Sequence, residues 1–285
     1  MKFKEKLKSD KFLITAELYP PKGVDTSSFF RRAACLSGLD AVNVTDNQRA
    51  SMRAGSLAMS KILIDHAIEP ILQLTVRDRN RIALQSELLS ANILGVENVL
   101  ILGGDHPSLG ENREAKAVYD LDTLQLIKTA RLLETGVDLA GKKLRGNPKF
   151  CVGAVVNPSA QPSDLQALML EKKAKAGTEF FQTQAIFDAE IYKNFFDKVK
   201  HLKVKILPGI ILIKSLEFMQ FLQSLSGINI PIETQDRINF ASNPLAEGIK
   251  ICSEMIKKFR SFADGVHIMA IGTEEYIPEI IKNSL

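Results

Sequence analysis

The sequence is poor in cysteine and has no hydrophobic run long enough to cross a membrane. Its three cysteines, Cys35, Cys151 and Cys252, are far apart and form no CxxC or CxxH pair. This argues against a disulfide framework and against a zinc site built from neighbouring residues. The charged amino terminus, MKFKEKLKSDKF, lacks the apolar core of a signal peptide. We therefore expect a cytoplasmic protein without a membrane segment.

A strong charge of either sign is also absent. The formal net charge is +4, and the densest basic cluster, RDRNR at 77–81, is interrupted by an acid. A nucleic-acid footprint would need a longer basic stripe, so no nucleic-acid partner is expected. With 285 residues, of which 45% are hydrophobic and 25% charged, the chain suits one large α/β barrel or two small domains.

Eight short apolar or β-branched runs alternate with segments of helical periodicity. The runs are LITAEL, LDAVNVT, PILQLT, ENVLILG, FCVGAVV, TEFFQTQ, VKILPGI and GVHIMAI. Most of them are spaced by about 25–31 residues, the size of one βα unit. In the helical segment RNRIALQSELLSANILG, the residues Ile82, Leu89 and Ile93 are expected to form the buried face. The pattern predicts a single-domain (β/α)8 TIM barrel over residues 1–285 with extra helices, and an open doubly wound sheet is the alternative.

Polar side chains gather at the carboxyl ends of these predicted strands. Residues i and i+2 of a strand share a face, and five runs end in such a pair. The pairs are Thr15 with Glu17, Asn43 with Thr45, Gln73 with Thr75, Gln182 with Gln184, and Gly103 with Asp105. Because an unpaired buried polar group costs about 1–3 kcal/mol, five placements at one end indicate a ligand pocket rather than packing.

The predicted pocket combines carboxylates and amides with few cations. Glu17 and Asp105 without a histidine make a poor transition-metal site, so no metal is expected. Amides and acids match a flat heterocycle that has alternating donors and acceptors. The residues alone lead to a small heteroaromatic ligand.

The ordered motifs resemble those of the methylenetetrahydrofolate reductase family. They run along essentially the whole chain as ITAELYPPKG, VNVTDNQ, QLTVRDRNR, LILGGDHP, FFQTQAIFD and ILPGI. The forms NVTDNQ and LTVRDRNR are similar to the branch found in anaerobic and acetogenic bacteria. The resemblance implies a barrel flavoprotein of one-carbon metabolism and methionine biosynthesis. Such a protein binds FAD, or FMN, and reduces 5,10-methylenetetrahydrofolate to 5-methyltetrahydrofolate by hydride transfer from flavin N5.

The resemblance also assigns roles to individual residues. Glu17 becomes the general acid that protonates the departing nitrogen, for which it must stay protonated near neutral pH. Asp105 becomes the second catalytic residue, facing pterin and flavin and tuning the flavin potential. The resemblance implies that the folate is bound by Gln184, Gln182, Asp105 and Leu216. It implies that the flavin is bound by Thr45, Gln73, Leu102, Gly103, Gly104, Asp105, Tyr119, Asp120, Lys172 and Lys173.

Several positions depart from the enteric pattern of the family. Gln73 stands where a His is common, Gly103 where an Arg is common, and Leu216 replaces a Phe that seats nicotinamide and folate. The electron donor is therefore NAD(P)H, ferredoxin or a partner subunit with metal clusters, and an oligomer is expected. Arg77 and Arg79 either contact ligand phosphates or carboxylates or cap a helix. Two other readings stay open: a pterin-binding methyl-transfer barrel without flavin, and a non-catalytic assembly subunit.

Overall fold

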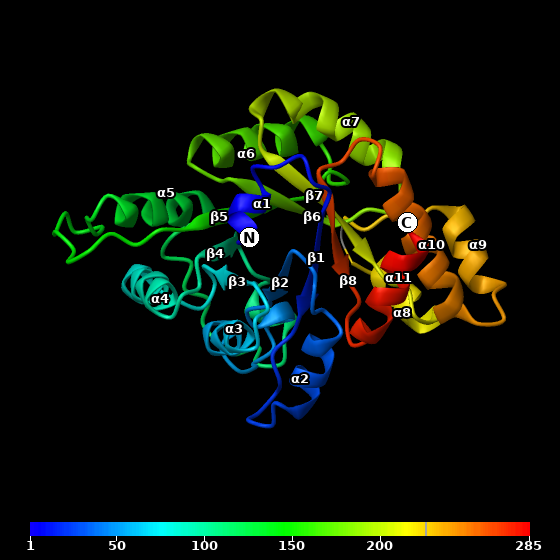
Figure 1. Ribbon diagram of the computed structural model, residues 1–285, viewed down its shortest axis with the longest axis horizontal. Coiled ribbons are helices and arrows are strands. Elements are labelled where there is room, and N and C mark those ends of the chain that lie inside the picture. The colour runs from blue at the N-terminus through cyan, green and yellow to red at the C-terminus, as the bar shows by residue number, and fades with distance from the viewer. Residues whose placement is uncertain (226) are drawn as a thin grey trace.

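The computed structural model describes residues 1–225 and 227–285, and Figure 1 shows its strands surrounded by helices. Eight parallel strands pair in chain order and close into a barrel through the contact of the last strand with the first. They are β1 Leu13–Leu18, β2 Ala41–Val44, β3 Pro70–Thr75, β4 Asn98–Leu102, β5 Cys151–Val156, β6 Phe180–Ala185, β7 Lys205–Ile211 and β8 Gly265–Met269. The predicted (β/α)8 barrel is confirmed, and the closing β1–β8 pair excludes the open sheet.

Helices follow the strands and include the expected extra ones. They are α1 Phe3–Lys6, α2 Ser27–Ala34, α3 Ser56–Asp65, α4 Arg81–Ile93, α5 Thr123–Glu134, α6 Ser163–Lys175, α7 Ala189–Val199, α8 Leu216–Gln223, α9 Ile232–Asn239, α10 Pro244–Phe259 and α11 Ile277–Asn283. Four short 3-10 turns complete the set: η1 Gln48–Ala50, η2 Pro107–Leu109, η3 Lys200–Leu202 and η4 Glu274–Tyr276. The additions are α1, which precedes β1, and three helices instead of one between β7 and β8.

Helix α4 lies where the sequence predicts it but buries a different face. Asn80 caps its first turn by accepting the backbone N–H groups of Ile82 and Ala83. The buried residues are Leu84, Leu88 and Ala91, while Ile82 and Ile93 are 71% and 84% exposed. The predicted face was wrong because apolar residues lie nearly all around this helix. Packing against the barrel, rather than the pattern, selects the buried stripe.

Alternation along the strands divides the barrel into an outer and an inner surface. Outward residues such as Val42, Leu72 and Val99 pack against the helices in the main core. Each such fully buried side chain contributes about 1.5–3 kcal/mol. Inward residues at the amino ends form a separate apolar plug, made of Leu13, Ala41, Ile71, Leu100, Cys151, Phe180 and Leu207 with Phe3 and Leu7 beneath it.

The apolar plug confines the polar residues to the other end of the barrel. The ring of Phe3, from α1, meets the ring of Phe180 edge-on at 5.2 Å and seals the amino-terminal end. The next inward positions along the strands are polar, with Thr15, Asn43 and Gln182 buried. The barrel is therefore open to a ligand only at the carboxyl ends of its strands, where such barrels place their sites.

Candidate active site at the barrel mouth

A chain of hydrogen bonds crosses the barrel interior above the apolar plug. The amide of Gln182 donates to the hydroxyl of Thr15 at 3.2 Å and to the side-chain oxygen of Asn43 at 3.1 Å. Asn43 donates back to the Gln182 oxygen at 2.6 Å. The hydroxyl of Thr15 lies 3.0 Å from Nδ1 of His267. We call these four residues the buried polar chain; its satisfied groups fix each side chain in one position.

The buried polar chain ends at Glu17, on the mouth side. Nε2 of His267 lies 3.8 Å from a carboxylate oxygen of Glu17. The side chain of His267 is 4% exposed and that of Glu17 is 22% exposed. The carboxyl group thus lies at the boundary between the fixed interior and the open mouth, which suits a group that exchanges a proton with a ligand.

A cavity of about 960 Å³ opens above Glu17, and we call it the mouth cavity. Gln184 of β6 also lines it. The apolar part of its lining comes mainly from Ile211, Phe218, Phe221, Leu222 and Met269. Three cations, Arg49, Arg53 and Lys214, also line it, so the expectation of few cations was wrong. The cavity combines an apolar wall, a carboxyl, an amide and positive charge.

The loop after β2 crosses the mouth. Asn47, Arg49 and Ala50 have φ values of 46°, 56° and 52°, in the left-handed region that non-glycine residues rarely adopt. The guanidinium of Arg49 lies 4.5 Å from the ring centroid of Phe221, which belongs to α8 and lines the same cavity. A cation–π contact therefore links this loop to α8.

Asp105 holds this loop instead of lining the mouth cavity. Its carboxylate accepts the backbone N–H of Arg49 at 3.1 Å, and among the described residues the cavity wall contains Glu17 and Gln184 but not Asp105. The predicted shared phase with the other strand ends was wrong, because β4 ends at Leu102 and Gly104 turns the chain with a φ of 79°. Its catalytic role stays a prediction.

The predicted cofactor residues of β2, β3 and β4 lie at neighbouring strand ends. Thr45 is buried and donates to Gln48 at 2.7 Å. Gln73 faces inward and is 8% exposed, and its amide group makes no hydrogen bond with the described residues. Leu102 and Gly103 are half-buried, and the space beside Gly103 is open where a side chain would project. An amide without a partner beside open space fits the polar edge of a flat ring, such as a flavin.

Tyr119 and Asp120 lie in the long loop between β4 and α5. The hydroxyl of Tyr119 donates to the carbonyl of Gly104 at 3.1 Å, which places its ring over the end of β4. Asp120 instead forms a bidentate pair with Arg81, with both hydrogen bonds at 2.9 Å. Hydrogen bonds from the side chain and backbone of Arg81 lower the pKa of Asp120 to about 2. The carboxylate of Asp120 is therefore already occupied by hydrogen bonds from Arg81, the first residue of α4.

The two predicted lysines differ in their surroundings. Lys172 is exposed on α6. Lys173 is half-buried and donates to the carbonyl of Val155 at 2.7 Å, at the end of β5. Burial lowers the pKa of Lys173. Its position at a strand end and its lack of a carboxylate partner among the described residues fit a contact to an anionic cofactor group.

Two predicted folate contacts do not reach the mouth cavity. Gln182 is 2% exposed and its amide is used within the buried polar chain. Leu216 begins α8 and packs in the apolar cluster beside the mouth. Phe218 and Phe221 of the same helix do line the cavity, so aromatic surface is present there despite the leucine at 216.

Arg77 and Arg79 clamp loops to the barrel. Arg77 is 2% exposed and donates to the carbonyls of Asp105 and Asn47, at 3.2 and 3.1 Å. Arg79 pairs with the buried Asp46 at 2.7 Å. These bonds join the loops after β2, β3 and β4. They are neither ligand contacts nor helix caps, which were the two alternatives that the sequence left open.

Sequence reasoning missed His267, although a signal was present. In the strand GVHIMAI, His267 shares the phase of Gly265 and Met269. A polar residue in the inward phase of an apolar strand is the same signal that identified Thr15 and Asn43. The three missed cations, Arg49, Arg53 and Lys214, lie in loops and carry no such periodic signal.

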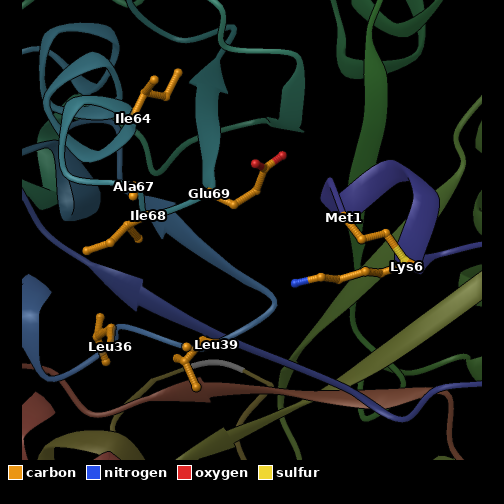
Figure 2. Close-up of a pocket in the computed structure, with 9 residues that line it drawn as sticks. Met1, Lys6, Leu36, Leu39, Ile64, Ala67, Ile68 and Glu69 are labelled. Carbon is orange, nitrogen blue, oxygen red and sulfur yellow. The ribbon is translucent and has the colours of Figure 1, made fainter.

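Other features of the chain add no competing centre. A hollow of about 340 Å³ is lined by Met1 and Lys6 of the amino-terminal segment and by Ile64, Ile68 and Glu69 near the start of β3. Figure 2 shows these side chains. It contains none of the predicted site residues. Among residues 1–225 and 227–285, no group of three or more His, Cys, Asp or Glu side chains is placed to hold a metal ion. No helix in the same ranges is long and apolar enough to span a bilayer.

The family comparison and the curated relatives agree on one protein family. A family model described as methylenetetrahydrofolate reductase matches residues 2–285. Methylenetetrahydrofolate reductase 2 of Schizosaccharomyces pombe is 24% identical over 311 residues, which cover 98% of this chain and 46% of that protein. The 5,10-methylenetetrahydrofolate reductase of Buchnera aphidicola is 25% identical over 237 residues, or 80% of this chain and 75% of its own. The chain thus spans about half the length of some relatives that it matches.

A solved structure shares the whole fold. An uncharacterized protein from Clostridium thermocellum, which binds two copies of 5-methyl-5,6,7,8-tetrahydrofolic acid, superposes with a TM-score of 0.70. The match covers 100% of this chain and 98% of that protein at 17% identity. At this identity the similarity concerns the fold alone.

Proposed function

The chain belongs to the methylenetetrahydrofolate reductase family, and from this premise we propose that it reduces 5,10-methylenetetrahydrofolate to 5-methyltetrahydrofolate. The observation that carries the proposal is that Glu17 and Gln184 line one cavity together with apolar and aromatic residues. The proposal takes residues 1–285 as a single catalytic domain that works in the cytoplasm.

Glu17 is the proposed proton donor. Reduction adds a hydride to the one-carbon unit and a proton to the nitrogen that leaves it, so the two additions together convert the methylene bridge to a methyl group. The carboxyl of Glu17 lines the cavity, and Nε2 of His267 lies 3.8 Å from it. A carboxylic acid held there protonates the departing nitrogen and opens the five-membered ring.

The remaining groups of the cavity orient the folate. The amide of Gln184 offers one acceptor and two donors to the pterin edge. Phe218 and Phe221 offer aromatic surface in the same cavity. Asp105 lies over the end of β4, where its negative charge favours positive charge developing on the one-carbon unit.

The proposed cofactor is FAD, with FMN as the alternative, and it supplies the hydride when bound. Gln73, Gly103, Tyr119 and Lys173 are the residues that would hold it, since they combine a free amide, open space, an aromatic hydroxyl and a cation. Asp120 contributes through the loop that carries Tyr119. Electrons come from NAD(P)H, ferredoxin or a partner subunit.

An absorbance spectrum of the purified chain between 300 and 550 nm, with and without added FAD, tests the proposal. Flavin bands that dithionite bleaches and that methylenetetrahydrofolate restores support the reductase. A colourless chain that binds neither FAD nor FMN contradicts the proposal. If that chain still binds folate, a pterin-binding methyl-transfer barrel is the better assignment.

A further inference from the structure

Strand β6 carries one residue more than its neighbour β7 where the two strands reach the barrel mouth. The register shifts so that Thr183 and Gln184 of β6 lie opposite only Pro208 of β7. Two residues on one strand opposite one residue on its partner form a β-bulge. On its other edge, β6 stays in regular register with β5 up to Thr183. The bulge therefore lies on the β6–β7 edge, at the residue that lines the mouth cavity, Gln184.

The directions of the side chains along β6 agree with the extra residue. Phe181 and Ile186 both pack in the main core between the strands and the helices, although an odd number of positions separates them. Regular alternation would place these two side chains on opposite faces of the strand. Between them, the consecutive residues Gln184 and Ala185 both line the mouth cavity. The bulge thus gives β6 two successive positions at the mouth, and the small side chain of Ala185 leaves room beside the amide of Gln184.

Two residues of β7 make the bulge possible. Pro208 has no backbone N–H to offer a ladder, and proline inside a sheet is confined to edges and bulges. Gly209 has no side chain, and a Cβ atom there would lie 2.5 Å from the carbonyl oxygen of Thr183 and 2.8 Å from that of Gln184. Because backbone oxygens cannot swing aside as a side-chain tip can, the close approach of the bulge requires a glycine at this position.

The hydroxyl of Thr183 takes the place of the interrupted ladder. It accepts the backbone N–H of Gly209 at 2.8 Å and donates to the carbonyl of Gln184 at 2.6 Å. Thr183 is 4% exposed and is not among the described residues that line the mouth cavity. Beyond the bulge, the N–H of Ile186 donates to the carbonyl of Gly209 at 2.8 Å and resumes the pairing. One side chain therefore ties both strands together at the point where their backbones do not pair.

The amide of Gln184 depends on this backbone for its direction. Its side chain is exposed, and it makes no hydrogen bond with the described residues. No neighbouring side chain therefore orients the amide before a ligand binds. Its position follows from the backbone of the bulge, whose carbonyl the Thr183 hydroxyl holds.

We infer that Thr183 is a positioning residue for the reaction: its hydroxyl fixes the bulge in β6 and thereby aims the amide of Gln184 at the folate. The inference rests on the proposed function, in which Gln184 contacts the pterin edge. Thr183 acts only through Gln184 and touches no reacting atom. Without the hydroxyl, the buried N–H of Gly209 loses its partner, so the bulge relaxes and the amide turns away from the pterin.

Calorimetric titration of 5-methyltetrahydrofolate into the full chain tests the inference. Thr183→Val keeps the shape of the side chain without the hydroxyl, and its affinity should fall about 10-fold, or ~1.4 kcal/mol. Thr183→Ser keeps the hydroxyl and should bind within about 3-fold of the wild type, which keeps the inference testable if the valine variant does not fold. FAD binding, followed by absorbance, should be unchanged in both variants, whereas general damage to the barrel would weaken both ligands.

A second substitution separates positioning from a general loss of stability. In a Gln184→Ala background the amide is absent, so adding Thr183→Val should change the folate affinity by less than about 2-fold. Thr178→Val is the matched control, since Thr178 precedes β6 and is also 4% exposed. Its hydroxyl has no hydrogen-bond partner among the described residues, so this variant should bind folate as the wild type does.

Three results would overturn the inference while leaving the proposed function intact. The first is wild-type folate affinity in Thr183→Val or in Gln184→Ala. The second is an equal loss from Thr183→Val with and without the Gln184 amide, which would make Thr183 a purely structural residue. The third is a loss in Thr183→Ser as large as that in Thr183→Val. A wild type that does not bind 5-methyltetrahydrofolate refutes the proposed function, and the inference with it.

Discussion

Nε2 of His267 lies 3.8 Å from a carboxylate oxygen of Glu17, at the point where the buried polar chain meets the mouth cavity. Below it, Thr15 contacts Nδ1 of His267 at 3.0 Å and Gln182 donates to Thr15. The contact with Thr15 orients the ring so that its other nitrogen lies toward Glu17. The barrel interior thus positions the one carboxyl group that faces the cavity from β1.

Glu17→Gln should separate the two half-reactions. The amide keeps the size and hydrogen bonding of the side chain but has no acidic proton. We expect flavin binding and flavin reduction to remain nearly intact, while folate reduction falls by about 10²–10⁴-fold, the usual contribution of a general acid. Stopped-flow absorbance of each half-reaction measures this, and normal folate turnover in the variant would show that Glu17 is not the acid.

Two substitutions at His267 should test whether this residue positions Glu17. His267→Asn keeps a group near Thr15 but removes the one facing Glu17, whereas His267→Gln keeps a neutral donor toward Glu17. Because a small misplacement of a catalytic group can cost up to about 10²-fold in rate, the folate half-reaction should slow by roughly 10- to 100-fold in His267→Asn.

His267→Gln should slow the same half-reaction less than His267→Asn does. Flavin reduction in the other half-reaction distinguishes this from general damage to the fold, since a purely structural role would slow both half-reactions. Identical rates in both variants and the wild type would remove His267 from the mechanism.

Asp105→Asn should raise the potential of the bound flavin. Removing a negative charge near a reduced, anionic flavin stabilises that form, and a change of about 30 mV corresponds to ~1.4 kcal/mol for a two-electron couple. The folate half-reaction should be slowed most. Potentials measured by dye equilibration test this, with Glu114→Gln, an exposed change in the same loop, as the control. An unchanged potential would leave Asp105 only its contact with Arg49.

Asp120→Asn should reduce stability in a pH-dependent way. Hydrogen bonds from Arg81 lower the pKa of Asp120 to about 2, below the ~3.9 of an unfolded chain. The contribution is therefore complete above about pH 4 and is lost as the pH falls toward 2. Thermal unfolding should show a lower midpoint for Asp120→Asn at pH 7 and a smaller difference near pH 3. A difference that grows on acidification would contradict the role of this pair.

The polar strand ends were predictable because they depend on local alternation. Thr15 and Glu17 point inward as their spacing requires, and so does Gln184. Asp105 was misplaced because the end of β4 and the turn at Gly104 depend on packing against other loops. For the same reason no sequence period indicates that Arg49 reaches across the mouth to Phe221.

Gly110→Ala should test whether the two loops over the mouth must stay in contact. A methyl group on Gly110 would fall on the carbonyl group of Ala50, and backbone atoms cannot swing aside as a side-chain tip can. The loops must then separate, which withdraws Arg49 from Phe221.

Overpacking costs about 1–3 kcal/mol, so folate affinity should fall by roughly 10- to 100-fold in Gly110→Ala. The same cost destabilises the folded chain, so the thermal midpoint should also fall by a few degrees. Gly55→Ala, at a position with open space in the same loop after β2, is the control and should bind normally. Equal folate affinity in both variants would show that ligand binding does not require the contact between Gly110 and Ala50.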